Sequence, residues 1–176
     1  MTIYAHAFWA WYPFRRRSWV GWFVLGAVVP DLPYVFLFAV AALRSGPSAL
    51  ADLELWDSLW RNPLIGGLHS FVPWGAMLLA TLVLRRIRGP AKIFGPAIAL
   101  VLGWGFHVML DMLTHRSDGY PIVWPVSDYR FPTPISYWEA EYHGVAFSLI
   151  CDGLIALLLL RLTSQRLRRT DATRAL

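Results

Sequence analysis

The sequence of 176 residues has one cysteine, few charged side chains and none of the common nucleotide-binding or serine-hydrolase motifs. A single thiol, Cys151, can form neither an internal disulfide nor a CxxC motif, so a metal site must use His, Asp and Glu. Charged residues make up 15% of the chain, against about 25% in an average soluble domain. Because GxSxG, Walker and dinucleotide motifs are missing, nothing supports a serine hydrolase, a P-loop nucleotidase or a dehydrogenase.

Apolar and aromatic residues dominate what is present. Hydrophobic residues make up 57% of the chain, and ten Trp, ten Phe and seven Tyr exclude a disordered or low-complexity segment. Four apolar runs each approach the ~20 residues that cross a bilayer core: 18–43, 64–84, 93–113 and 144–160. We therefore predict an all-α, membrane-embedded bundle of about four long helices plus short interfacial helices. A single domain spans 1–160, and a basic cytoplasmic tail with a frayed end follows over 161–176.

Arginines flank the apolar runs and indicate an orientation. They cluster before the first run, between the second and third, and after the fourth, whereas 44–63 and 114–143 hold few. The positive-inside rule then places both termini in the cytoplasm and these two loops outside, as in a bacterial inner (plasma) membrane protein. The net charge of +5 fits a lipid headgroup surface better than nucleic acid as the main partner.

Two shorter segments are predicted to lie at the membrane surface. Residues 1–14 are rich in aromatic side chains but too short to span, which indicates an interfacial or partly inserted helix. Residues 48–60 place Leu53, Trp56 and Trp60 on one helical face, which indicates a short helix on the outer surface.

Ionisable side chains interrupt all four apolar runs. A carboxylate facing lipid at mid-bilayer costs on the order of 3 kcal/mol, so these groups are expected to face the bundle interior. Four helices with inward polar groups suggest one shared site. The residues are Asp31, His69, His107, Asp111 and Asp152.

The sharpest local pattern is His107-x3-Asp111-x3-His115. Residues four apart on a helix drift by only about 40° per step, so the three side chains share a face. Imidazole and carboxylate are ligands for Zn²⁺, Mn²⁺ or Fe²⁺. Glu139 and His143 form a second i, i+4 pair that either completes a second metal position or is simply solvated.

Three further residues fit the same site. Asp31 lies between Pro30 and Pro33, so the helix is expected to break there with the carboxylate pointing inward or capping the second half. His69 follows two glycines, and Ser70 is placed to hold its second ring nitrogen. His6, in the aromatic segment 1–14, is the remaining histidine.

Taken together, these motifs resemble the YdjM-type family (DUF457) of inner-membrane metal-dependent hydrolases. The resemblance covers residues 6 to about 147 and rests on an early histidine followed by five motifs. These are Gly26-Ala27-Val28-Val29-Pro30-Asp31, Gly67-Leu68-His69-Ser70, His107-x3-Asp111, Thr114-His115 and Trp124-Pro125-Val126-Ser127-Asp128.

The resemblance implies a fold like zinc-dependent phospholipase C and the S1/P1 nucleases, with two or three divalent ions, Zn²⁺ first and Mn²⁺ or Fe²⁺ as alternatives. In that group an amino-terminal residue joins the His, Asp and Glu ligands. The phospholipases use His-x3-Glu where this chain has Glu139-x3-His143. The ligands it implies are His6, Asp31, His69, His107 and Asp111, with His115, Glu139 and His143 as weaker matches.

The expected reaction is hydrolysis of a phosphoester in a lipid or another small amphiphilic substrate by metal-activated water. Asp111 or Asp31 would accept the proton, and Arg130, in a loop over the site, would either bind the phosphate or pair with a surface carboxylate. Two other classes are open: a small transporter with a proton relay through Asp31, His107, Asp111 and Asp152, and a non-catalytic membrane scaffold. The chain could also sit shallowly in the membrane.

Overall fold

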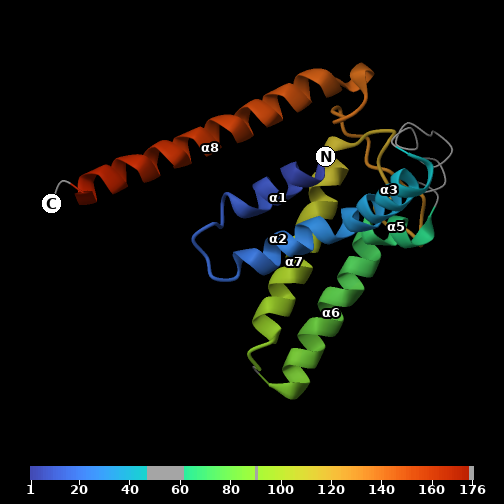
Figure 1. Cartoon of the computed structure of the whole chain (residues 1–176). Coiled ribbons are helices and arrows are strands. Elements are labelled where there is room, and N and C mark those ends of the chain that lie inside the picture. The colour runs from blue at the N-terminus through green and yellow to red at the C-terminus, as the bar shows by residue number, and fades with distance from the viewer. Residues whose placement is uncertain (47–61, 90, 175–176) are drawn as a thin grey trace.

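A computed structural model describes residues 1–46, 62–89 and 91–174, with side chains up to 168 (Figure 1). Over these ranges all regular elements are helical, so the all-α prediction is confirmed. The surface helix expected over 48–60 lies outside the described residues. The elements are α1 (Ile3–Trp11), α2 (Val20–Val28), η1 (Val29–Asp31), α3 (Leu32–Ser45), α5 (Pro63–Leu68), α6 (Phe71–Arg88), α7 (Phe94–Thr114), η3 (Ala140–Tyr142) and α8 (Gly144–Arg174).

Three helical segments are long and apolar enough to cross a membrane: Val20–Ser45, Phe94–Thr114 and Gly144–Arg168. They correspond to three of the four apolar runs, as expected of a membrane protein. The remaining run, 64–84, divides into α5 and α6 around His69 and Ser70, and Ser70 Oγ caps α6 by accepting from Val72 N at 3.3 Å. α6 ends in Arg85, Arg86 and Arg88 and is not among the three helices apolar enough to span a membrane.

The segment Val20–Ser45 is broken, as its prolines predict. α2 ends at Val28, one 3-10 turn contains Pro30, and α3 begins at Leu32 with Pro33 in its first turn. Proline lacks the backbone N–H that a continuous helix requires. Asp31 therefore lies at a break between two helices.

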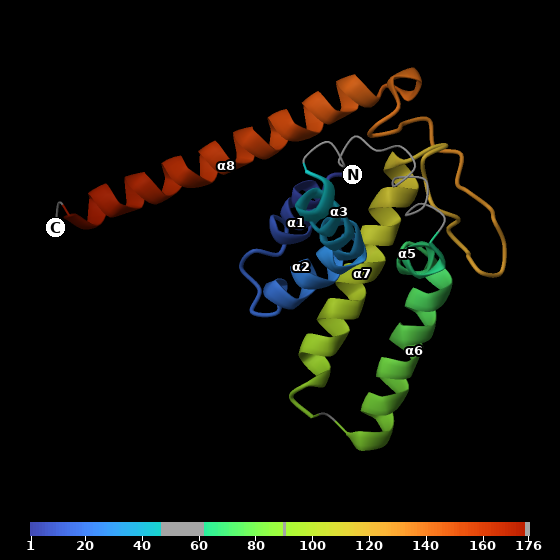
Figure 2. The ribbon, with the colours of Figure 1, turned by 45° about the vertical axis from the view of Figure 1, so that its right-hand side comes forward.

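α2 and α7 cross with their backbones in direct contact (Figure 2). A Cβ at Gly103 would lie 1.9 Å from the carbonyl oxygen of Phe23, and one at Gly26 would lie 1.8 Å from that of Leu100. No larger side chain fits between the helices at these points. This close approach places the backbone of α2 against the imidazole of His107.

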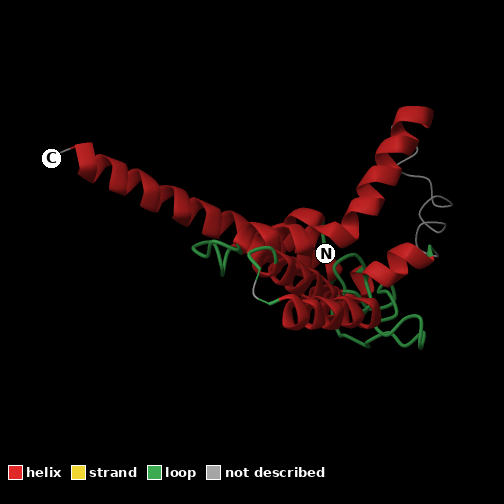
Figure 3. Ribbon diagram, turned by 90° about the horizontal axis from the view of Figure 1, so that it is seen from below, coloured by secondary structure: helices red, strands yellow, loops and turns green. Residues whose placement is uncertain are grey.

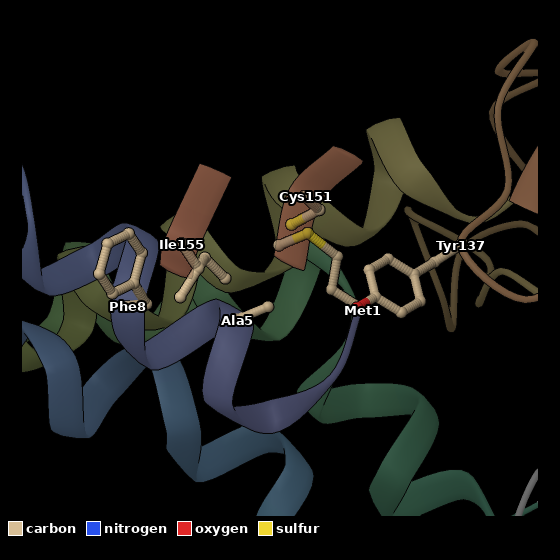
Figure 4. Packing of buried hydrophobic residues seen from close by; sticks show 6 residues of the cluster. All are labelled: Met1, Ala5, Phe8, Tyr137, Cys151 and Ile155. Atoms are coloured by element: carbon tan, nitrogen blue, oxygen red, sulfur yellow. The ribbon is translucent and has the colours of Figure 1, made fainter. Parts of the chain in front are cut away.

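α1 packs into the protein. Its side chains form a core with the start of α8 and the loop before it, composed of Met1, Ala5, Phe8, Tyr137, Cys151 and Ile155 (Figure 4). Burial of these apolar groups stabilises the fold by about 25 cal/mol per Å² removed from water. α1 thus packs against the start of α8, while its place at or in the membrane stays a prediction.

α8 projects away from the other helices (Figure 3). Many of its large apolar side chains are exposed, including Leu149 and Leu160 at 69% each, which suits contact with lipid. The prediction of a frayed end after Arg161 is wrong, because the helix continues to Arg174. Arginine favours helix almost as strongly as leucine, so the change from apolar to basic residues does not end it.

Candidate metal centre

Five of the predicted ligands, from four parts of the chain, come together at one place. His6 comes from α1, Asp31 from the break after α2, His69 from the end of α5, and His107 and Asp111 from α7. Their ligand atoms form two overlapping groups, His6 with Asp31 and His107, and His69 with His107 and Asp111. Within each group these atoms lie within 4.8 Å of one another.

Asp111 and Asp31 lie between the imidazoles. Asp111 Oδ2 is 3.1 Å from His107 Nε2, and Asp111 Oδ1 is 3.0 Å from His6 Nε2. Asp31 Oδ1 is 3.5 Å from His69 Nε2 and 3.8 Å from His107 Nε2. The rings of His6 and His107 stack with centroids 3.9 Å apart. Ligand atoms at these spacings can contact a common cation.

Backbone carbonyls orient two of the imidazoles. Nδ1 of His107 is 2.8 Å from the carbonyl oxygen of Ala27, and Nδ1 of His69 is 2.8 Å from that of Ile65. Because a carbonyl only accepts, each Nδ1 carries the hydrogen, and in the neutral ring each Nε2 has a lone pair toward the cluster. A metal-binding histidine usually donates a hydrogen bond from the ring nitrogen that does not bind the metal, as Nδ1 does here.

Ser70 does not hold the ring of His69, contrary to the sequence-based expectation. Its hydroxyl bonds to the carbonyl oxygens of Ile122 and Trp124 instead and fixes the loop after α7. Trp104 Nε1 donates to the carbonyl of Leu68 at 2.5 Å and holds the end of α5 against α7. His69 is therefore positioned by backbone contacts.

Several buried nitrogen and oxygen atoms of the cluster lack a hydrogen-bond partner within the part of the chain that the structure describes, as expected of atoms that bind a cation. Among the described residues, His6 Nδ1 and Nε2, Asp31 Oδ2 and His107 Nε2 are buried without a hydrogen-bond partner. Buried polar atoms are ordinarily paired, and unpaired ones indicate a missing ion or water. Asp31 makes no side-chain cap bond to α3, so the capping alternative is not seen. Burial lowers the pKa of His6 to about 4, which keeps its imidazole neutral and able to bind a cation at neutral pH.

His115 borders the cluster together with two groups that sequence reasoning missed. Its Nε2 lies 3.3 Å from Asp111 Oδ1 and contacts the α-amino group of Met1, which is 2.9 Å from the same oxygen. Its Nδ1 bonds to Asp118 Oδ2 at 2.7 Å. Burial and the Met1 amine lower the pKa of His115, but Asp111 and Asp118 outweigh them and raise it. Asp118 lies beyond the end of α7 at Thr114, so helical spacing gave no signal for its contact with His115.

The structure does not place Glu139 or His143 in either ligand group. Glu139 accepts hydrogen bonds from the Ser117 backbone N–H, at 3.1 Å, and from the Ser117 hydroxyl. His143 is exposed at the end of η3, with a left-handed φ of 63°. Because no continuous helix joins them, their i, i+4 spacing gives them no common face.

The loop after α7 borders the cluster, where the sequence placed it. A small pocket beside Asp111 is lined by His69, His115, Tyr120 and Arg130. Tyr120, another residue that sequence reasoning missed, stacks on His69 with centroids 4.6 Å apart, and its hydroxyl contacts that of Tyr34. Arg130 donates to the Ser117 carbonyl at 2.9 Å, so its guanidinium is held at the pocket.

Asp152 lies apart from the cluster. Its Oδ1 accepts from the hydroxyls of Tyr4, at 2.9 Å, and Tyr137, at 3.4 Å. In the described part of the chain it joins neither ligand group.

Comparison with known protein families, curated proteins and solved structures found no match for the chain. The site itself offers imidazoles and carboxylates in a buried setting. Such donor sets bind borderline divalent cations, of which Zn²⁺, Mn²⁺ and Fe²⁺ are the usual examples.

Proposed function

We propose that the chain is a membrane-embedded metal-dependent hydrolase of the YdjM type (DUF457) that cleaves a phosphoester bond in an amphiphilic substrate. One observation carries the proposal. Buried imidazoles from separate elements converge with Asp31 and Asp111, and backbone carbonyls leave Nε2 of His69 and His107 free to bind a cation.

His6, Asp31, His69, His107 and Asp111 would hold the metal, with Zn²⁺ the first candidate. His107 serves only one ion, because its Nδ1 is bonded to Ala27. A second ion, which the family resemblance implies, would be held by the residues of the other group, either His6 with Asp31 or His69 with Asp111. Bound divalent ions lower the pKa of water and stabilise negative charge on phosphoester oxygens.

The protein's own groups would bind the substrate and accept the proton. Asp31 Oδ2, which has no hydrogen-bond partner among the described residues, is placed to take a proton from water. Arg130 uses one N–H on the Ser117 carbonyl and has others for phosphate oxygens. Tyr120, stacked on His69, restricts solvent at the pocket.

The order of basic and ligand residues along the helices supports an orientation in the membrane. Arg15–Arg17 precede α2 and Asp31 follows it. Lys92 precedes α7 and Asp111 lies near its end, and His69 precedes α6, whose end carries arginines. Each helix thus runs between a basic end and the cluster. We propose a cytoplasmic C-terminus in an inner membrane and a site toward the outer face, where lipid phosphoesters lie. In this orientation the N-terminus lies at the site, because the α-amino group of Met1 contacts Asp111.

The structure favours this function over the two alternatives. In a scaffold, the polar groups should satisfy one another. Nε2 of His6 and of His107 lie 3.0 and 3.1 Å from oxygens of Asp111, but His6 Nδ1 and Asp31 Oδ2 are buried without a hydrogen-bond partner in the described ranges. A relay through Asp152 is not supported, because the hydrogen bonds of Asp152 are to tyrosine hydroxyls.

Metal analysis of the purified full-length protein tests the proposal. We expect stoichiometric zinc, manganese or iron and hydrolysis of a chromogenic phosphodiester, with both lost in His69→Gln. Asp152→Asn, which removes an intramembrane carboxylate outside the cluster, should retain both. Metal-free protein that neither gains thermal stability nor becomes active on addition of Zn²⁺, Mn²⁺ or Fe²⁺ would exclude the proposal.

A further inference from the structure

A second polar pocket lies between the turn after α1 and the basic part of α8. Arg15 and Arg16 line it from the turn, and Arg166 lines it from α8, together with Trp11, Leu162 and Gln165. None of these residues lines the pocket at the metal centre. Segments about 150 positions apart in the sequence thus bring three guanidinium groups to one place.

This pocket has the charge of an anion site. Its lining contains three arginines and no acidic residue. Arg15 is held in place because its guanidinium stacks 4.3 Å above the Tyr12 ring and donates to the Tyr12 carbonyl. A guanidinium has five N–H donors, so this bond leaves others for a ligand. Like charges repel, and a bound phosphate would offset that repulsion through paired charge-assisted hydrogen bonds.

The surroundings of the pocket favour a lipid over a free phosphate. Leu162 and Arg166 belong to the last part of the membrane-spanning length of α8, Gly144–Arg168, where headgroups are expected. Trp11 adds an aromatic side chain of the kind enriched at that depth. The same turn also borders a larger apolar pocket between α2 and α7, lined by Phe14, Trp19, Trp22, Ile98 and Leu102. That pocket suits an acyl chain.

We propose that Arg15, Arg16 and Arg166 bind the phosphate of an anionic phospholipid and so join α8 to α1 at the membrane surface. The apolar core between these helices lies toward the start of α8, at Cys151 and Ile155. A lipid at Arg166 would connect them a further three turns along. This inference does not depend on the hydrolase proposal.

Native mass spectrometry of the full-length protein in detergent tests it, with phosphatidylglycerol and phosphatidylcholine of the same acyl chains as probes. The variant Arg16→Gln/Arg166→Gln removes two pocket arginines and spares Arg15, whose contacts with Tyr12 are structural. The matched control, Arg17→Gln/Arg168→Gln, removes the same charge from the same two segments outside the pocket. Elution as a single species and an unchanged melting temperature establish that both variants fold.

We expect wild type to prefer phosphatidylglycerol and the pocket variant to bind it at least about ten-fold more weakly than the control, because the variant loses the charge-assisted hydrogen bonds of two arginines. Equal losses in the two variants would indicate diffuse attraction and overturn the proposal, as would equal binding of both lipids. Glycerol phosphate that competes as well as the lipid would overturn the lipid assignment.

Discussion

Two segments of the chain carry acidic and histidine residues at the same spacing, yet they form different structures. His107, Asp111 and His115 lie on or just after a helix that is continuous to Thr114, and their side chains meet around Asp111. Between Glu139 and His143 the chain makes one 3-10 turn and enters the left-handed region. The i, i+4 spacing therefore predicts a shared face only where the helix is continuous.

The second segment supports the first instead of adding ligands to it. Glu139 holds Ser117 through its backbone N–H. Ser136 donates to Asp118 Oδ1 at 3.0 Å. Both bonds fix the loop that presents Asp118 to His115, as outer partners of metal ligands do.

The largest difference in Zn²⁺ affinity is expected between two variants, each of which loses one carboxylate from one of the two segments. Asp111→Asn keeps the shape but removes the charge that four histidines and the Met1 amine contact. We expect it to weaken Zn²⁺ binding by more than the ~10–100-fold typical of an outer partner. Glu139→Gln should cost ten-fold or less. Titration of the apoprotein with Zn²⁺ against a competing chelator measures both.

Circular dichroism and the elution profile separate lost binding from lost folding, because Asp111 is buried. An Asp111→Asn protein that is folded and binds Zn²⁺ as wild type does would contradict the ligand assignment. A Glu139→Gln protein with the larger loss would reverse the roles of the two segments.

Substitution of Asp118 should have an effect between those of Asp111→Asn and Glu139→Gln, because Asp118 connects the two segments. Burial raises the pKa of Asp118, but the hydrogen bond and charge of His115, together with the contacts of Glu139 and Ser136, outweigh it and the net pKa is lowered. We expect Asp118→Asn to weaken metal binding by ~10–100-fold, as for other outer partners. Asp128→Asn, in the same loop, serves as control and should leave the affinity unchanged. Equal effects of the two substitutions would show that the loop acts through its total charge.

The sequence predicted the helical class, three of the apolar spans and four members of the cluster for a physical reason. Asp31, His69, His107 and Asp111 interrupt apolar runs, and the cost of exposing them to lipid requires that they face inward. The carbonyls of Ala27 and Ile65 could not be predicted as partners, because every residue has a carbonyl. Their positions follow from the close crossing of α2 and α7 and from the turn before His69.

Local residues indicate that the apolar run 64–84 divides into two helices, although its hydropathy alone suggests one. Gly66 and Gly67 precede His69, and Ser70 is a preferred residue for a helix N-cap. The contact between Met1 and Asp111 joins positions 110 residues apart. Periodicity reports only neighbours within a few turns, so no local pattern could indicate it.

The smallest expected effect concerns His143 and changes stability without changing metal binding. A non-glycine residue in the left-handed region costs about 1–2 kcal/mol, so His143→Gly should raise the melting temperature by a few degrees. Gly144→Ala should lower it, because the new Cβ would lie 2.7 Å from the Glu139 carbonyl oxygen. Thermal unfolding in detergent, with metal content measured on the same samples, checks both. If a stable His143→Gly protein lost its metal, His143 would be a metal ligand in the wild-type protein, and both segments would then supply ligands.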